Sequence, residues 1–208
     1  MLEDTIKLTP EDQLFLLGDF IDRGPRNREV LDYILELMND GFQIYPLMGN
    51  HEYFILRDME FCYKNPSKIR DLIQSKDLLN LEYEIEVRFV NFIKKLPYYY
   101  ELDEFILVHA GLDFRRAHPL EDYKSMIYAR DFNVVSDKIN GKTLIHGHTP
   151  ISLNKIQNQI LNHKTNGVIN LDNGCVYKKY KLESDIDLGR LCALDLDKMA
   201  LLYCEFKD

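Results

Sequence analysis

The sequence predicts an α/β fold, because short apolar runs of strand length alternate with stretches whose apolar residues recur at helical spacing. Residues 14–17 and 44–48 are apolar runs that each stop at a glycine, which predicts two buried strands. Between them, the apolar residues of 30–38 recur at helical spacing, and Gly41 ends that pattern. The order strand, helix, strand is typical of an α/β chain.

The same alternation continues to the C-terminus. Further strands are predicted at 105–108, 143–145, 168–171, 191–196 and 200–206. A hairpin turn is predicted at 195–198, between the last two. Residues 52–95 have a helical and more charged pattern, broken at Asn65-Pro66. We interpret 52–95 as a helical insertion, or cap, within a single domain of residues 1–208, although an ordinary connecting helical layer explains the pattern equally well.

Composition and charge exclude several classes of protein. No stretch approaches the roughly 18 uninterrupted apolar residues of a membrane-spanning helix, and the N-terminus lacks the basic and apolar regions of a secretory signal. We therefore expect a cytoplasmic protein without a membrane partner. The formal net charge of -8 argues against a general nucleic-acid binder. The four cysteines form no C-x-x-C pair, which favours reduced thiols.

Four polar clusters each follow an apolar run directly. They are Gly18-Asp19-Phe20-Ile21-Asp22-Arg23-Gly24, Gly49-Asn50-His51-Glu52, His109-Ala110-Gly111 and His146-Gly147-His148-Thr149. Open α/β sheets bind ligands beyond the carboxyl ends of their strands, so these clusters are expected to converge on one pocket. Their Asp, Asn and His donors suit Mn, Fe or Zn. Each cluster alone has an ordinary structural explanation, such as a turn or a helix cap; their joint occurrence favours a functional site.

These clusters carry a resemblance to a known family. The chain resembles the calcineurin-like metallophosphoesterases, and within them the bacterial branch of the PPP serine/threonine protein phosphatases and their relatives that hydrolyse diadenosine tetraphosphate. The signatures G-D-x-x-D-R-G, G-N-H-E, H-G/A-G and G-H-T all stand in this sequence, in the family's order. The resemblance runs from about Leu8 to the C-terminus and implies the family's αββα sandwich.

The resemblance implies a two-metal site. Asp19 corresponds to the carboxylate that bridges two divalent metal ions, and Asn50, His109 and His148 correspond to the remaining ligands of the second metal. A bridging carboxylate offsets the repulsion between two cations, which together can activate a water and bind the phosphate oxygens. Mn, Fe and Zn are the candidate ions.

It also implies an acid and two phosphate-binding arginines. His51 corresponds to the general acid that protonates the leaving group, and Asp22 to the carboxylate that orients it. Arg23 and Arg130 match the arginines that bind phosphate. His146 is a candidate for supporting a metal ligand, with a purely structural role equally open. In many superfamily members a metal-binding histidine stands where this chain has Pro150.

One family motif is missing from the sequence. The family normally opens with a strand ending in Gly-Asp-x-His-Gly, whose Asp and His bind the first metal, and the sequence contains no such motif. We therefore expect the first strand of the fold to be absent. We also expect the chain to bind one metal firmly, if it binds any, and to be weakly active or inactive. An exposed sheet edge left by that strand could drive self-association.

Three functions follow from the resemblance. The leading expectation is a phosphomonoester hydrolase, namely a serine/threonine protein phosphatase acting on a phosphoprotein or phosphopeptide, because Asp22-Arg23-Gly24 favours that branch. The first alternative is hydrolysis of diadenosine polyphosphates or other small nucleotides. The second is a non-catalytic phosphate-binding module, which the missing motif favours and the intact Asp22 and His51 disfavour.

Overall fold

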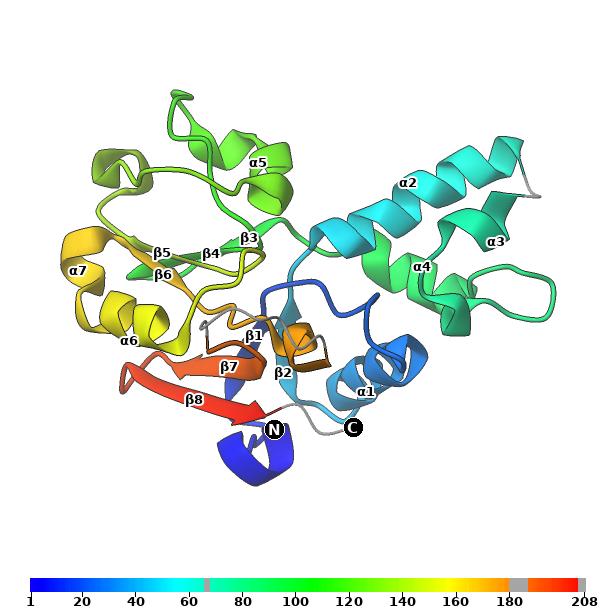
Figure 1. Cartoon of the computed structure of the whole chain (residues 1–208), viewed down its shortest axis with the longest axis horizontal. Helices are drawn as coiled ribbons and strands as arrows, with labels where there is room; N and C mark the ends of the chain where they lie inside the picture. The colour runs from blue at the N-terminus through cyan, green and yellow to red at the C-terminus, as the bar shows by residue number, and fades with distance from the viewer. Residues whose placement is uncertain (66–67, 180–186, 206–208) are drawn as a thin grey trace. The chain divides into compact units, whose positions relative to one another are not determined.

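A computed structural model describes residues 1–65, 68–179 and 187–205 and confirms the mixed α/β fold (Figure 1). The chain divides into two compact units. One consists of Thr9–Tyr98, here called the 9–98 unit, and the other of Met1–Leu8 with Tyr99–Asp208, here called the 99–208 unit. Within the described part of the chain, no helix has the length and apolar character needed to cross a membrane.

The 9–98 unit begins with a strand–helix–strand motif. Strands β1 (Gln13–Leu16) and β2 (Gln43–Pro46) pair in parallel, and helix α1 (Asn27–Asn39) connects them and packs on β2. Both strands were predicted within two residues of these bounds. β2 tolerates its proline because Pro46 is the last residue of the strand. The ladder then continues through the Leu47 N–H, which donates to the Leu16 carbonyl at 2.8 Å.

The rest of the 9–98 unit is helical, as the pattern of 52–95 predicts. Its elements are α2 (Asn50–Lys64), α3 (Ile69–Leu72), the short 3-10 helix η3 (Lys76–Leu78) and α4 (Val87–Lys94). Helix α2 packs against α3 and α4, and η3 packs against α1. Leu78, Phe89 and Ile93 are fully buried and form part of the core of this unit. A role of these helices as a cap stays a prediction.

The 99–208 unit contains a four-stranded sheet in the order β3-β4-β5-β6. Its strands are β3 (Tyr99–Glu101), β4 (Phe105–Val108), β5 (Thr143–His146) and β6 (Val168–Asn170). β4, β5 and β6 are parallel, and β3 is antiparallel to β4. Every residue of β4 and β5 is buried, which explains the continuously apolar sequence of β4 and the apolar Leu144-Ile145 pair of β5.

Helices and turns connect these strands. They are α5 (Tyr123–Tyr128), α6 (Leu153–Leu161), α7 (His163–Asn166) and the 3-10 turns Pro119–Glu121, Ser136–Ile139 and Cys175–Lys179. Helix α6 was not predicted, although Leu153, Ile156 and Ile160 recur at helical spacing and are buried. It begins at Ser152, whose hydroxyl caps the helix, and it packs against β6.

The unit ends in the predicted hairpin. β7 (Arg190–Asp195) and β8 (Ala200–Glu205) pair antiparallel, and the Asp195 carboxylate accepts the Lys198 N–H at 3.0 Å in the turn between them. The predicted strand end at Phe206 lies outside the described residues. A π-helical turn, η1 (Leu2–Ile6), packs against β8.

Candidate functional site

The loop that follows β1 has an unusual backbone. Asp19, Asp22 and Arg23 have positive φ angles of 56°, 67° and 58°, a left-handed region that is uncommon for every residue except glycine, though less so for Asp and Asn. Each such residue costs on the order of 1–3 kcal/mol and persists only where its surroundings hold it in place. These three residues are predicted site residues, so the strain lies where the chemistry is expected.

Glu52 holds this loop against the start of α2. Its buried carboxylate accepts the N–H groups of Asp19 at 2.8 Å, Phe20 at 2.8 Å and Gly49 at 3.0 Å. Burial and the nearby charge of Asp19 raise the pKa of Glu52 to about 7, although the hydrogen bonds from the N–H groups of Asp19 and Phe20 favour its ionised form. Sequence reasoning assigned Glu52 no role. Its place three residues after Gly49, the residue preceding the helix, is a capping signal that could have found it.

Gly49 allows this close approach. A Cβ atom at position 49 would lie 2.4 Å from Asp19 Oδ1, 2.5 Å from Asp19 N and 2.7 Å from a Glu52 carboxylate oxygen. No side chain larger than hydrogen fits there without displacing the backbone. The glycine therefore brings the β1 loop and the N-terminus of α2 together. The His51 N–H then donates to Asp19 Oδ1 at 3.2 Å.

His51 and Asp22 form a buried acid–base pair. His51 Nδ1 lies 2.6 Å from Asp22 Oδ2, and the two side chains are 6% and 4% exposed. Burial lowers the pKa of His51, but the Asp22 hydrogen bond and the charges of Asp19 and Asp22 outweigh it, so the pKa is raised. The other ring nitrogen, Nε2, is buried and has no hydrogen-bond partner in the described part of the chain. His51 therefore has one nitrogen bound to a carboxylate and one available for another molecule.

Ser75 binds the other side of Asp22. The Asp22 N–H donates to Ser75 Oγ at 3.1 Å, and the Ser75 hydroxyl donates to Asp22 Oδ1 in a short hydrogen bond. Ser75 is 1% exposed. No sequence motif marks this serine, which lies 53 residues beyond Asp22 in the helical segment.

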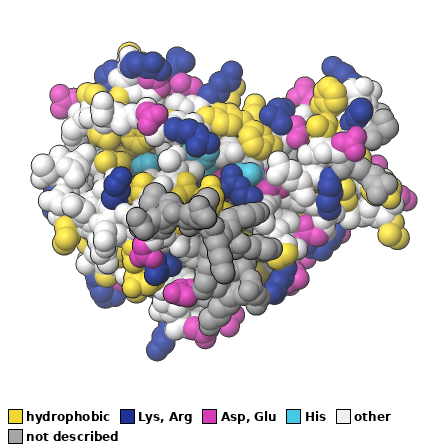
Figure 2. Space-filling model, viewed as in Figure 1, with side chains coloured by type: hydrophobic (Ala, Val, Ile, Leu, Met, Phe, Trp, Pro, Cys, Tyr) yellow, Lys and Arg dark blue, Asp and Glu magenta, His cyan; other side chains and the backbone are white. Residues whose placement is uncertain are grey.

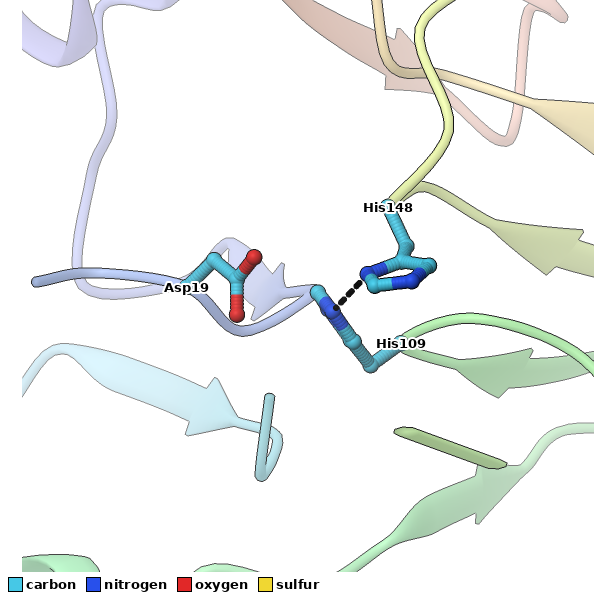
Figure 3. Close-up of side chains that lie close together, drawn as sticks. All are labelled: Asp19, His109 and His148. Atoms are coloured by element: carbon cyan, nitrogen blue, oxygen red, sulfur yellow. Dashed lines mark hydrogen bonds between the residues drawn. The ribbon is translucent and has the colours of Figure 1, made fainter. Parts of the chain in front are cut away.

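In the 99–208 unit, His109 and His148 follow neighbouring parallel strands. His109 comes directly after β4 and His148 two residues after β5, so the carboxyl ends of the strands bring them together. His109 Nε2 lies 3.1 Å from His148 Nδ1 (Figure 3). The Gly147 N–H donates to the His109 carbonyl at 2.8 Å and fixes the two loops. Two imidazole nitrogens facing each other at this distance can share one proton or bind one cation.

His146 is the last residue of β5 and is 7% exposed. Burial lowers its pKa to about 4, so the ring is neutral at pH 7. Nδ1 lies 3.0 Å from the Gly147 carbonyl, and the ring packs edge-on against Phe132. These contacts fit a ring that supports the His148 loop. They agree equally with a role in supporting a metal ligand and with a purely structural role of His146.

The two predicted phosphate-binding arginines are exposed. Arg23 stands in the strained loop after Asp22, and Arg130 follows the C-terminus of α5. Among the described residues, neither forms an ion pair with a carboxylate, so each guanidinium has its hydrogen-bonding fork available for an anion. On the face drawn in Figure 2, the coloured Lys and Arg side chains are interspersed with Asp and Glu side chains.

The predicted site residues thus fall into two sets. The 9–98 unit brings together Asp19, Asp22, Arg23, Asn50 and His51, with Asn50 buried as the first residue of α2. The 99–208 unit holds His109, Arg130, His146 and His148. The carboxylate and amide oxygens of the first set and the imidazoles of the second are donors that fit a transition metal.

Comparison with known proteins agrees with these features. The family model for calcineurin-like phosphoesterases matches residues 1–188. The asymmetrical bis(5'-nucleosyl)-tetraphosphatase of Anoxybacillus flavithermus is 22% identical over 84% of this chain, which spans 76% of that protein. The symmetrical bis(5'-nucleosyl)-tetraphosphatase of Erwinia tasmaniensis is 31% identical over 53% of this chain, which spans only 38% of that protein.

Among solved structures, a metallophosphoesterase from Sphaerobacter thermophilus shares the fold, with a TM-score of 0.50 and 17% sequence identity. The match covers 94% of this chain and 78% of that one. The family model spans nearly the whole sequence and includes all four polar clusters. The chain belongs to the calcineurin-like phosphoesterase family.

Proposed function

We propose that this chain is a metal-dependent hydrolase of dinucleoside polyphosphates that cleaves its substrate asymmetrically. The observation that carries the proposal is the buried His51–Asp22 pair beside Asp19, in a chain of this family. The relatives that align over most of their length are named asymmetrical bis(5'-nucleosyl)-tetraphosphatases. Their names favour a small nucleotide substrate over the phosphoprotein that the signature alone suggested.

The residues that would hold metal are Asp19, Asn50, His109 and His148. One carboxylate, one amide oxygen and two imidazoles suit Mn, Fe or Zn. A bound metal would supply an activated water and would withdraw charge from the phosphate oxygens. In the 9–98 unit, Glu52 and Gly49 set the position of Asp19. In the 99–208 unit, the hydrogen bond from Gly147 to His109 sets the spacing of the two histidines.

His51 would donate a proton to the leaving oxygen. Asp22 holds the Nδ1–H group, so the proton that moves is on Nε2, which has no hydrogen-bond partner among the described residues and lies 3.9 Å from Asp19 Oδ2. The raised pKa of His51 keeps the ring protonated over a wider pH range. Arg23 would bind a phosphate oxygen through its exposed guanidinium.

A second candidate is hydrolysis of a phosphomonoester, including a phosphoserine peptide. The observation in its favour is the same His51–Asp22 pair. An alkoxide is a much poorer leaving group than a nucleotide phosphate and has the greater need of a proton donor. The two functions therefore differ in how strongly they depend on His51.

The test compares both substrates on one preparation. The full chain is incubated with Mn²⁺ and either diadenosine tetraphosphate or a phosphoserine peptide, and the products are separated by chromatography. The proposal predicts AMP and ATP in equal amounts from the dinucleotide, with one water consumed per cleavage. Two ADP would indicate symmetrical cleavage, and turnover of the peptide alone would favour the second candidate.

One test variant and one control variant accompany this experiment. His51→Asn is expected to lose most of the turnover, whereas His118→Asn, an exposed histidine outside the motifs, is expected to keep it. Absence of turnover of both substrates with Mn²⁺, Fe²⁺ and Zn²⁺ would refute both hydrolase proposals. It would leave the phosphate-binding module as the surviving function.

A further inference from the structure

We propose that Ser75 is a positioning residue for the proton donor, acting through Asp22. The inference rests on the proposed function for the role of His51, but the contacts that carry it all lie within the 9–98 unit. Neither the family signatures nor the comparisons assign Ser75 a role. It lies in the segment between α3 and η3, outside the four polar clusters.

A single serine hydroxyl makes two hydrogen bonds to Asp22. It accepts the Asp22 N–H at 3.1 Å and donates to Asp22 Oδ1. The other carboxylate oxygen, Oδ2, is 2.6 Å from His51 Nδ1. The carboxylate of an aspartate has a broad torsional preference and needs external contacts to fix its plane. With Ser75 on one oxygen and His51 on the other, the plane is fixed.

The bond to the Asp22 N–H has a separate consequence. Asp22 has a φ of 67°, a left-handed conformation that residues with a Cβ adopt only where their surroundings hold them in it. The Ser75 Oγ receives the N–H in that conformation. One hydroxyl therefore holds both the backbone and the side chain of the residue that orients His51.

Ser75 is itself anchored to the helix that follows the Asp22 loop. Two residues further on, the Asp77 carboxylate accepts Asn27 Nδ2 at 2.6 Å and the Arg28 N–H at 2.8 Å, both from the first turn of α1. Arg28 Nε also donates to the Asp77 carbonyl at 2.8 Å. Buried Ile73 and Leu78 flank this segment. These contacts hold the segment that carries Ser75 in a fixed position against α1.

This geometry distinguishes a positioning role from a merely structural one. A hydroxyl with only a structural role would stabilise the fold without affecting how Asp22 orients His51. The Ser75 hydroxyl instead donates to the same carboxylate that receives the His51 Nδ1–H. Removing it frees the carboxylate to turn, and His51 loses its orientation although every reacting group is still present.

The first experiment needs neither metal nor activity. Proton NMR of the full chain is expected to show a downfield Nδ1–H resonance from His51, protected by its short bond to Asp22. In Ser75→Ala and in the nearly isosteric Ser75→Cys, this resonance is expected to broaden or disappear through exchange with water. Ser125→Ala, which removes a hydroxyl bonded to the Asp122 carbonyl in the other unit, is the matched control. An unchanged resonance in folded Ser75→Cys would overturn the proposal.

The second experiment compares leaving groups. Phenyl phosphate releases a poor leaving group that needs protonation, and p-nitrophenyl phosphate releases a much better one. Ser75→Ala is expected to lower kcat for phenyl phosphate by about tenfold or more, to lower it much less for p-nitrophenyl phosphate, and to leave KM within about twofold. Equal losses on both esters would indicate a structural role and overturn the inference. If the wild-type chain turns over neither ester, the phosphomonoesterase candidate alone is removed, and the NMR result still decides the role of Ser75.

Discussion

Replacing Gly49 by alanine tests how closely the two loops of the 9–98 unit are packed. Gly49 has φ -95° and ψ 175°, an extended conformation that alanine adopts without strain. Any loss of stability therefore comes from the contacts of the added Cβ. The added Cβ would lie 2.4 Å from Asp19 Oδ1 and 2.5 Å from Asp19 N, and the second of these atoms belongs to the backbone.

The expected cost has two parts. Overpacking of one carbon against backbone costs about 1–3 kcal/mol. The displacement also separates the Glu52 carboxylate from the N–H groups of Asp19 and Gly49, and each of these hydrogen bonds to a charged group contributes about 1.5–3 kcal/mol. Because the loop relaxes partly, we expect a total of about 3–5 kcal/mol. For a chain of this size that lowers the Tm by roughly 10 °C.

Thermal unfolding followed by circular dichroism measures this cost. Gly24→Ala is the matched control, because Gly24 ends the signature that contains Asp19, its backbone is not left-handed and its added Cβ would meet nothing closer than 3.8 Å. That variant is expected to be neutral or to stabilise the fold by up to about 1 kcal/mol. A Tm for Gly49→Ala within about 2 °C of the wild type would refute the reasoning, because it would show that the two loops can accommodate the added Cβ without loss of stability.

Three further outcomes are expected. His51→Asn should lower kcat by about 10²–10⁴ with little change in KM, measured by steady-state kinetics; an unchanged kcat would remove His51 as the proton donor. His109→Gln and His148→Gln should each weaken Mn²⁺ binding by at least about tenfold in calorimetric titration, whereas His118→Gln should not; equal affinities would place the metal elsewhere. Gly111→Ala should destabilise the chain by about 1–3 kcal/mol, because its Cβ would lie 2.2 Å from the ring of Phe132. An unchanged Tm would show that the ring moves aside freely.

Local patterns were sufficient to predict most strands and the positions of the polar clusters. β1 and β4 each contain a short apolar run that ends at a glycine or at a polar residue, so hydrophobic pattern and turn chemistry agree. His109 and His148 were placed together for the same reason, since residues at the carboxyl ends of adjacent parallel strands meet. The role of each residue, in contrast, came from family resemblance and stays a proposal.

Contacts between distant segments could not be predicted in this way. β3 is only three residues long and pairs with β4, so its existence depends on a partner more than on its own sequence. α6 was not predicted, although its buried Leu153, Ile156 and Ile160 recur at helical spacing. Ser75 has no local signal at all, since a serine beside a 3-10 turn is ordinary until its partner is known.

The strained loop shows why the site depends on these distant contacts. A sequence containing two aspartates and an arginine between glycines can form many turns, and a loop with three residues in the left-handed region is not the turn of lowest energy. Hydrogen bonds from distant segments of the chain select this loop conformation. Glu52, 33 residues away, binds the Asp19 N–H, and Ser75, 53 residues away, binds that of Asp22. Residues that never touch substrate therefore determine where the reacting groups point, and changes in the helical segment should alter chemistry without altering any motif.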